Sequence, residues 1–252
     1  MTSVTMQEAA AKVMVALDKP DAEAALRLAS QLQGAGCWMK VGMELFYAAG
    51  PGVVRELKSR GFRVFLDLKL HDIPNTVRGG ARSIARLGVD LFNVHAAGGT
   101  AMMAAALEGV RDAIEAGDAA VPGPAVQAPL VIAVTQLTST SQRVLNDEIG
   151  IAGSVEDAVI RYARQAKAAG LQGVVASPLE VGAIKAACGA DFLTVTPGIR
   201  PRGADIGDQS RVRTPKEAVQ DGTDYLVIGR PITAAADPSQ ALQTILKEMT
   251  EA

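Results

Sequence analysis

The sequence is poor in cysteine and in long apolar runs, and each lack excludes a class of protein. Cys37 and Cys188 are its two cysteines, too few for a disulfide framework and without the CxxC spacing typical of a zinc site. No apolar run approaches the roughly 18 residues that a membrane-spanning helix needs, and residues 1–11 lack the basic and apolar segments of a secretory signal. We therefore expect a soluble, cytoplasmic protein that binds no membrane and no structural metal.

An excess of positive charge is also missing. The chain has 25 Lys and Arg residues against 27 Asp and Glu residues, and aromatic residues make up only 4% of it. Proteins that bind nucleic acids usually carry a basic surface, often with aromatic side chains that stack on bases. Because the sequence has neither feature, we expect no nucleic-acid partner.

The sequence does contain a repeated alternation of strand-like and helix-like segments. With 252 residues, 48% of them hydrophobic, the chain is long enough to bury one large core. Short apolar or β-branched runs alternate with alanine-rich amphipathic stretches, which is the pattern of βα units around a parallel sheet. The expected strands cover residues 13–17, 37–41, 63–69, 91–95, 130–135, 173–176, 192–196 and 225–228.

This alternation predicts a (β/α)8 TIM barrel that forms a single domain over residues 1–252. The alternative is a doubly wound open sheet, but no GxGxxG motif follows the first strand. Residues 117–128 are expected to be a connector rich in glycine and proline, and residues 201–214 a lid or binding loop. The expected helices cover residues 21–33, 44–60, 76–87, 99–116 and 155–169, a short helix from 178, and then 215–220 and 231–249.

One segment concentrates charge in apolar surroundings. Residues 67–76 read DLKLHDIPNT and follow the apolar run 64–66. In a strand, Asp67 and Lys69 would project from the same face, while Asp72 lies beyond the strand end, just before a proline that can open a helix. Unpaired buried charges are strongly destabilising. The segment therefore indicates a structural ion-pair network or a chemical site.

Polar residues also follow most of the other expected strands. Barrels assemble their active sites at the carboxyl ends of their strands. Taken singly, these residues have structural explanations, because Asp18 can cap a helix and Lys40 can be a paired cation. Together they predict a site at this end of the barrel, formed by Asp18, Lys40, Asp67, Lys69, Asp72, His95, Thr138, Arg200 and Arg230.

The loops after the last two strands have the composition of a phosphate site. Gly229 allows close backbone approach, the helix start after it offers free N–H groups, and Arg230 adds a bidentate donor. Residues 196–200, which end in Arg200, follow the preceding strand, and barrels often bind phosphate at these two loops. Either loop alone could be an ordinary glycine turn, but the pair favours phosphate binding.

Over nearly its whole length the sequence resembles the orotidine 5′-phosphate decarboxylase family in its bacterial form. The most specific part is the DLKLHDIPNT segment, and the order and spacing of the other segments agree. These are Asp18, Lys40, residues 137–139, residues 197–200, Gln209 and Gly229-Arg230. The resemblance implies a barrel of the ribulose-phosphate-binding type that converts orotidine 5′-phosphate to uridine 5′-phosphate and CO2, the final step of de novo pyrimidine synthesis, without a cofactor.

The resemblance also implies a role for each site residue. Lys69 would protonate C6 of the pyrimidine after CO2 leaves, because a positioned ammonium can stabilise a developing carbanion and then protonate it. Lys40, Asp67 and Asp72 would form a charged network beside it, with Asp72 donated by the other subunit of a homodimer. The implied substrate-binding residues are Asp18 and Lys40 at the ribose, Thr138 and Gln209 near the pyrimidine, Gly229 and Arg230 at the phosphate, and also Asp67, Lys69, Asp72, Ile73, Thr76 and Arg200.

Two other functions remain open from the sequence. Related phosphate-binding barrels use similar Asp and Lys positions to hold Mg²⁺ beside an enediolate, as sugar-phosphate decarboxylases or aldolases, and a nucleotide-binding barrel without turnover is the other alternative. The segment 71–76 and Gln209 favour the pyrimidine enzyme, and a non-catalytic barrel would be expected to lose Lys69 or Asp72. His71 and His95 are expected to have structural or interface roles.

Overall fold

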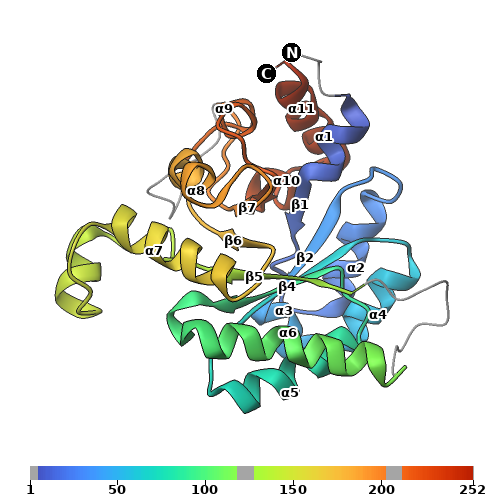
Figure 1. The fold of residues 1–252 in the computed structure, drawn as a ribbon. Helices are drawn as coiled ribbons and strands as arrows, with labels where there is room; N and C mark the ends of the chain where they lie inside the picture. The colour runs from blue at the N-terminus through green and yellow to red at the C-terminus, as the bar shows by residue number, and fades with distance from the viewer. Residues whose placement is uncertain (1–4, 118–127, 203–211, 252) are drawn as a thin grey trace.

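The structure is a computed structural model that describes residues 5–117, 128–202 and 212–251. Eight parallel strands form a closed barrel in which each strand pairs with its neighbours in chain order (Figure 1), so the predicted (β/α)8 barrel is confirmed. The strands are β1 Val13–Ala16, β2 Trp38–Gly42, β3 Val64–Leu70, β4 Leu91–His95, β5 Leu130–Val134, β6 Gly173–Val175, β7 Leu193–Thr196 and β8 Tyr225–Ile228.

Helices follow the strands and cover the outside of the barrel (Figure 1). Their apolar faces pack on the outward side chains of the strands, which is why the strands are buried on both faces. In the described ranges, no helix is both long and apolar enough to cross a membrane. The helices are α1 Met6–Lys12, α2 Ala22–Gln31, α3 Met43–Ala49, α4 Gly52–Ser59, α5 Pro74–Ala85, α6 Gly99–Glu115, α7 Val155–Ala168, α8 Val181–Cys188, α9 Pro215–Gln220, α10 Arg230–Thr233 and α11 Pro238–Thr250, with short turns η1 Ala96–Gly98, η2 Val144–Glu148 and η3 Pro178–Glu180.

Two of the predicted helices are divided in the structure. The single helix predicted over 44–60 is wrong, because α3 ends where Gly50 adopts a φ of 65° and Pro51 precedes the start of α4. The terminal helix predicted over 231–249 is also two helices, since Asp237 caps α11 by accepting the N–H of Gln240.

The N-terminal helix α1 was not predicted from the sequence. It begins at a capping box in which Thr5 and Glu8 bond each other's backbone N–H groups, and it packs beside α11 (Figure 1). The two long predicted loops fall largely outside the described residues, the connector 117–128 at 118–127 and the loop 201–214 at 203–211.

An apolar layer closes the inside of the barrel. Phe65 and Leu91 are among its members, with 1% and 0% of their surface exposed. Burial of a side chain of this size contributes about 1.5–3 kcal/mol to stability. Phe65 also lines the cavity described below, so this apolar layer adjoins the cavity.

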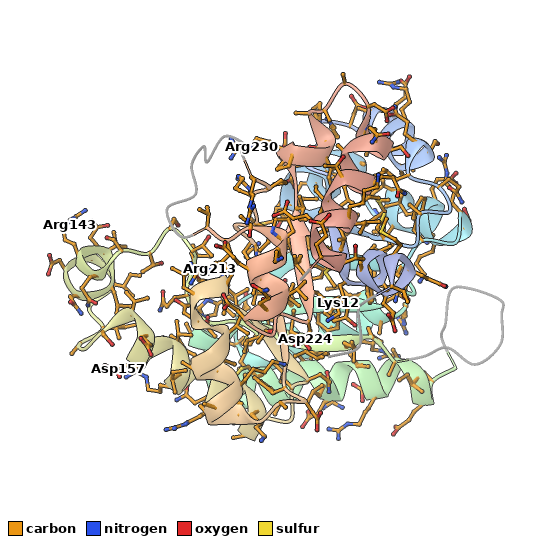
Figure 2. All side chains as sticks on the ribbon, turned by 90° about the horizontal axis from the view of Figure 1, so that it is seen from above. Lys12, Arg143, Asp157, Arg213, Asp224 and Arg230 are labelled. Atoms are coloured by element: carbon orange, nitrogen blue, oxygen red, sulfur yellow. The ribbon has the colours of Figure 1, made fainter. Side chains whose placement is uncertain are left out.

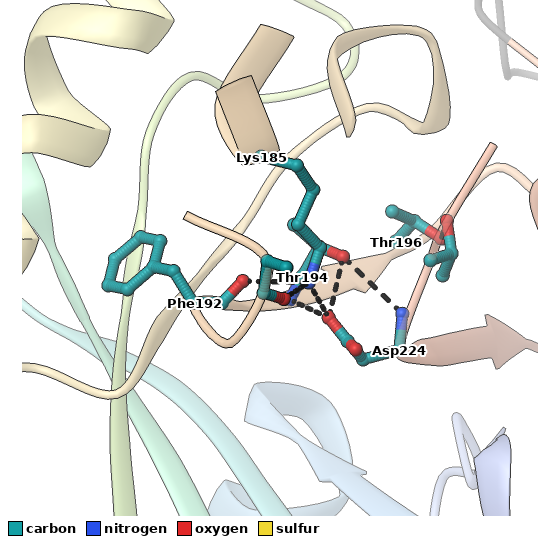
Figure 3. Close-up of polar contacts among 7 residues, drawn as sticks. Lys185, Phe192, Thr194, Thr196 and Asp224 are labelled. Carbon is teal, nitrogen blue, oxygen red and sulfur yellow. Dashed lines mark hydrogen bonds and ion pairs between the residues drawn. The ribbon is translucent and has the colours of Figure 1, made fainter. Parts of the chain in front are cut away.

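The amino ends of the strands carry two clamps of half-buried charged residues. Asp224, just before β8, accepts hydrogen bonds on Oδ2 from Lys185 Nζ at 2.6 Å and from the Thr194 N–H at 2.7 Å (Figure 3). Asp90, just before β4, likewise accepts hydrogen bonds on Oδ2 from Lys58 Nζ at 2.6 Å and from the Val64 N–H at 2.7 Å. Each clamp joins a helix to the amino ends of two neighbouring strands, so stabilising contacts and the candidate site lie at opposite ends.

Candidate functional site

A cavity of about 600 Å³ lies at the carboxyl ends of the strands. The structure therefore brings together most of the residues that the sequence placed in a site. Among the predicted residues, those that line the cavity are Asp18, Lys40, Asp67, Lys69, Thr138, Arg200, Gly229 and Arg230.

Charged side chains alternate in sign across the cavity floor. Lys40 Nζ lies 3.2 Å from Asp18 Oδ1 and 3.4 Å from Asp67 Oδ2. Lys69 Nζ donates to the other oxygen of the same carboxylate, Asp67 Oδ1, at 2.6 Å. The side chains of Lys40 and Asp67 are only 9% and 15% exposed. Each of these buried charges is therefore paired, as a stable site requires.

The expected proximity of Asp67 and Lys69 is confirmed, but a regular strand does not produce it. In β3, Leu66 pairs with Phe92 and Leu70 with Val94, so the register against β4 shifts between them. Lys69 has a φ of 55°, and it is the one non-glycine residue with positive φ among the described residues. Such backbone conformations are strained and tend to occur at functional sites. The irregularity directs the Lys69 side chain into the cavity.

The network favours ionised Asp67. Burial by itself raises the pKa of this carboxyl, but the ammonium charges of Lys40 and Lys69 and hydrogen bonds from Lys69 and Asn93 outweigh it and lower the pKa below its ordinary value. Asp67 is therefore negatively charged at neutral pH. A carboxylate in this position holds the ammonium of Lys69 at the cavity.

The contact made by Asn93 was not predicted from the sequence. This residue of β4 is 1% exposed, and its Nδ2 donates to Asp67 Oδ1 at 2.7 Å. Its Oδ1 accepts the backbone N–H of Lys69 at 2.8 Å. A usable signal was present, because Asn93 is a polar residue between the apolar residues Phe92 and Val94 of a strand.

Three of the implied substrate-binding residues lie outside the cavity of this single chain. Asp72, Ile73 and Thr76 are exposed to solvent at the junction of β3 and α5. Asp72 Oδ1 accepts the N–H of Ile73 at 2.6 Å, and within the described part of the chain it forms no ion pair with Lys69. The prediction for Gln209 falls outside the described residues.

The loops after β7 and β8 bring cationic groups to the far side of the cavity. Arg200 and Arg230 line it beside Gly198 and Gly229, and Arg230 opens α10 (Figure 2). The Arg200 N–H donates to the Arg213 carbonyl at 2.9 Å, which joins the two ends of the loop around residues 203–211. Two guanidinium groups and glycine backbone at one edge suit an anionic group such as a phosphate.

His71 and His95 lie together next to the network. Their ring centroids are 5.6 Å apart. Burial lowers the pKa of His95, and the proximity of His71 and Lys69 lowers it further, although Asp67 opposes this. His95 is therefore neutral at neutral pH, and neither histidine lines the cavity.

Comparison with known proteins gives one consistent result. Residues 11–245 match the sequence model described as the orotidine 5′-phosphate decarboxylase/HUMPS family. The orotidine 5′-phosphate decarboxylase of Moorella thermoacetica is 56% identical over 238 residues, which cover 94% of this chain and 92% of that protein. A solved structure of orotidine 5′-phosphate decarboxylase from Lactobacillus acidophilus has a TM-score of 0.81 and 42% identity, covering 94% of this chain and 98% of that one. The chain belongs to the orotidine 5′-phosphate decarboxylase/HUMPS family.

Proposed function

We propose that this protein decarboxylates orotidine 5′-phosphate to uridine 5′-phosphate and CO2, the last step of de novo pyrimidine nucleotide synthesis, in the cytoplasm. The observation that carries the proposal is the paired Lys69 ammonium on the floor of a cavity whose far side has two arginines. Membership of the family and the names of relatives with more than half of their residues identical support the same reaction.

Lys69 is the proposed acid. Loss of CO2 leaves a carbanion at C6 of the pyrimidine with no adjacent π acceptor to delocalise it. An ammonium held 2.6 Å from Asp67 Oδ1 can stabilise that charge as it develops and then transfer its proton to C6. This chemistry uses side chains of the protein, so we propose that no cofactor takes part.

The remaining cavity residues bind the rest of the substrate in this proposal. Arg230, the Gly229 amide and Arg200 bind the phosphate, and Asp18 and Lys40 contact the ribose. Thr138 contacts the pyrimidine, and Gln209, which the resemblance also assigns to the pyrimidine, falls outside the described residues. Binding energy from the phosphate, which is remote from the reacting carbon, can then support closure over the site.

We also propose that the active form is a homodimer in which Asp72 reaches the partner's cavity, with Ile73 and Thr76 contributing from the same segment. Ile73, which follows Asp72 in the chain, is 67% exposed, and two further large apolar side chains, Tyr47 and Met43 of α3, are 72% and 44% exposed. They follow the neighbouring strands β2 and β3. Exposed apolar clusters of this kind are typical of interfaces.

The sugar-phosphate alternative requires a divalent cation between carboxylates. In the structure the ammonium of Lys40 lies between Asp18 and Asp67, and within the described residues no three Asp, Glu, His or Cys side chains form a group that could hold a metal. This arrangement favours the pyrimidine substrate over the magnesium-dependent reaction.

The proposal is tested by the absorbance change of orotidine 5′-phosphate when purified protein is added, with and without EDTA. We expect turnover that EDTA leaves unchanged. Lack of turnover would refute the proposed function, whereas turnover that EDTA abolishes would show that the reaction depends on a metal.

A further inference from the structure

The β3–β4 pair is irregular where β3 delivers its charged residues. Because Leu66 pairs with Phe92 and Leu70 with Val94, residues 67–69 all lie opposite Asn93. A bulge of this kind leaves backbone groups without ladder partners. A buried N–H group that lacks a partner is costly, so a side chain that satisfies it stabilises the irregular conformation.

Asn93 supplies the missing partner. Its Oδ1 accepts the Lys69 N–H at 2.8 Å, and its Nδ2 donates to Asp67 Oδ1 at 2.7 Å. The orientation of the amide follows from chemistry, since an N–H needs an acceptor and a carboxylate needs a donor. One buried side chain therefore contacts the backbone of Lys69 and the carboxylate that binds its ammonium.

We propose that Asn93 is a positioning residue, which fixes the Lys69 ammonium for proton transfer by holding the left-handed backbone of Lys69 and the carboxylate plane of Asp67 together. Its effect on turnover rests on the proposed decarboxylation. Asn93 does not line the cavity, so it acts through these two residues and without touching substrate.

Loss of the amide would have two linked effects. The Lys69 N–H would lose its acceptor, which frees the backbone to leave its φ of 55°. Asp67 would lose one of the hydrogen bonds that lower its pKa. Both effects would move the ammonium away from its position, and small displacements of a reacting group reduce rates strongly.

The first test is steady-state kinetics of Asn93→Ala and Asn93→Asp. We expect kcat to fall by about 10- to 100-fold in Asn93→Ala while KM changes far less. Asn93→Asp keeps the volume and the acceptor but places a second acceptor against Asp67, so its kcat should fall at least as much. If Asn93 only fills space, the Asp variant would retain most of the activity that the Ala variant loses, and the proposal would be wrong.

A matched control lies at the other end of the same strand pair. Asp90→Asn weakens the clamp that joins β3, β4 and Lys58, far from the cavity. It should lower the melting temperature and leave kcat unchanged. If Asn93→Ala behaves in the same way, losing stability with unchanged kcat, then Asn93 is merely structural and the proposal is overturned.

A second readout needs no turnover. Carbon NMR titration of the Asp67 carboxyl, assigned with Asp67→Asn, should give a higher pKa in Asn93→Ala than in the unmodified protein, because a hydrogen bond to the charged form is lost. An unchanged pKa would contradict the proposal. If the unmodified protein fails to decarboxylate orotidine 5′-phosphate, the proposed function fails while this titration still decides the role of Asn93.

Discussion

Lys69 combines a strained backbone with a paired ammonium, and its side chain is only 23% exposed. Lys69→Ala removes the proposed proton donor, so we expect the rate of decarboxylation to fall by at least about 1,000-fold. Uridine 5′-phosphate should still bind, because the proposed phosphate ligands Arg230 and Gly229 are unchanged. Calorimetric titration with that nucleotide and the absorbance assay measure the two effects.

The control for this variant is Lys216→Ala, which removes a lysine that donates to the carbonyl of Glu251 and does not line the cavity. It should retain full activity. Decarboxylation at the normal rate by Lys69→Ala would show that another group supplies the proton.

The lowered pKa of His95 leads to a prediction of how folding stability depends on pH. Its pKa in the folded protein is lowered from the ordinary value of 6.5 by burial and by nearby His71 and Lys69. The unfolded chain then binds more protons between the two pKa values, so stability is complete above about pH 6.5 and decreases as the pH falls below it. The slope should be a fraction of the one-proton limit of about 1.4 kcal/mol per pH unit, because His95 is partly exposed.

Urea unfolding of the unmodified protein and of His95→Gln between pH 7.5 and about 5.5 measures this effect. The Gln variant should show a flatter dependence of unfolding free energy on pH. Equal slopes in the two proteins would mean that His95 does not contribute.

At the scale of elements, α5 and α6 are closely packed through Gly109. A Cβ at this position would overlap the carbonyl oxygen of Arg78, and it would lie 3.0 Å from the backbone nitrogen of Arg82. Gly109→Ala should therefore push the helices apart and destabilise the protein by about 1–3 kcal/mol. Since α5 begins directly after Ile73, the activity should fall as well.

Gly182 in α8 is the matched control for this prediction. A Cβ there meets no atom within 4 Å, so Gly182→Ala should stabilise the helix by about 0.5–1 kcal/mol. Thermal unfolding of both variants measures the difference. Equal melting temperatures would contradict the packing argument.

Some features of the strands and helices could be predicted from the sequence, and others could not. Apolar runs identify each strand, and parallel strands carry Lys40, Asp67 and Lys69 to one end, so the barrel and the cavity followed from periodicity. The bulge opposite Asn93 depends on pairing between two strands and has no signature in either alone. The Gly50-Pro51 pair marks the break between α3 and α4 in the sequence, and the single helix predicted over 44–60 runs through this pair.

At the scale of the whole molecule, one chain provides an incomplete version of the proposed site. Asp72 is exposed between β3 and α5, directly before exposed Ile73, and it does not line the cavity of its own chain. A partner related by twofold symmetry would place each Asp72 in the other cavity and would cover the apolar side chains at the same time.

This arrangement predicts complementation between inactive variants. Asp72→Ala and Lys69→Ala should each be nearly inactive, but their heterodimer contains one cavity with both native residues. Random exchange of equal amounts should therefore restore about one quarter of the normal activity. Asp67→Ala mixed with Lys69→Ala is the control, because both residues belong to the same chain's network and no cavity becomes complete. Native mass spectrometry verifies that exchange occurred, and inactive heterodimers of Asp72→Ala with Lys69→Ala would show that the two residues do not share a site across the interface.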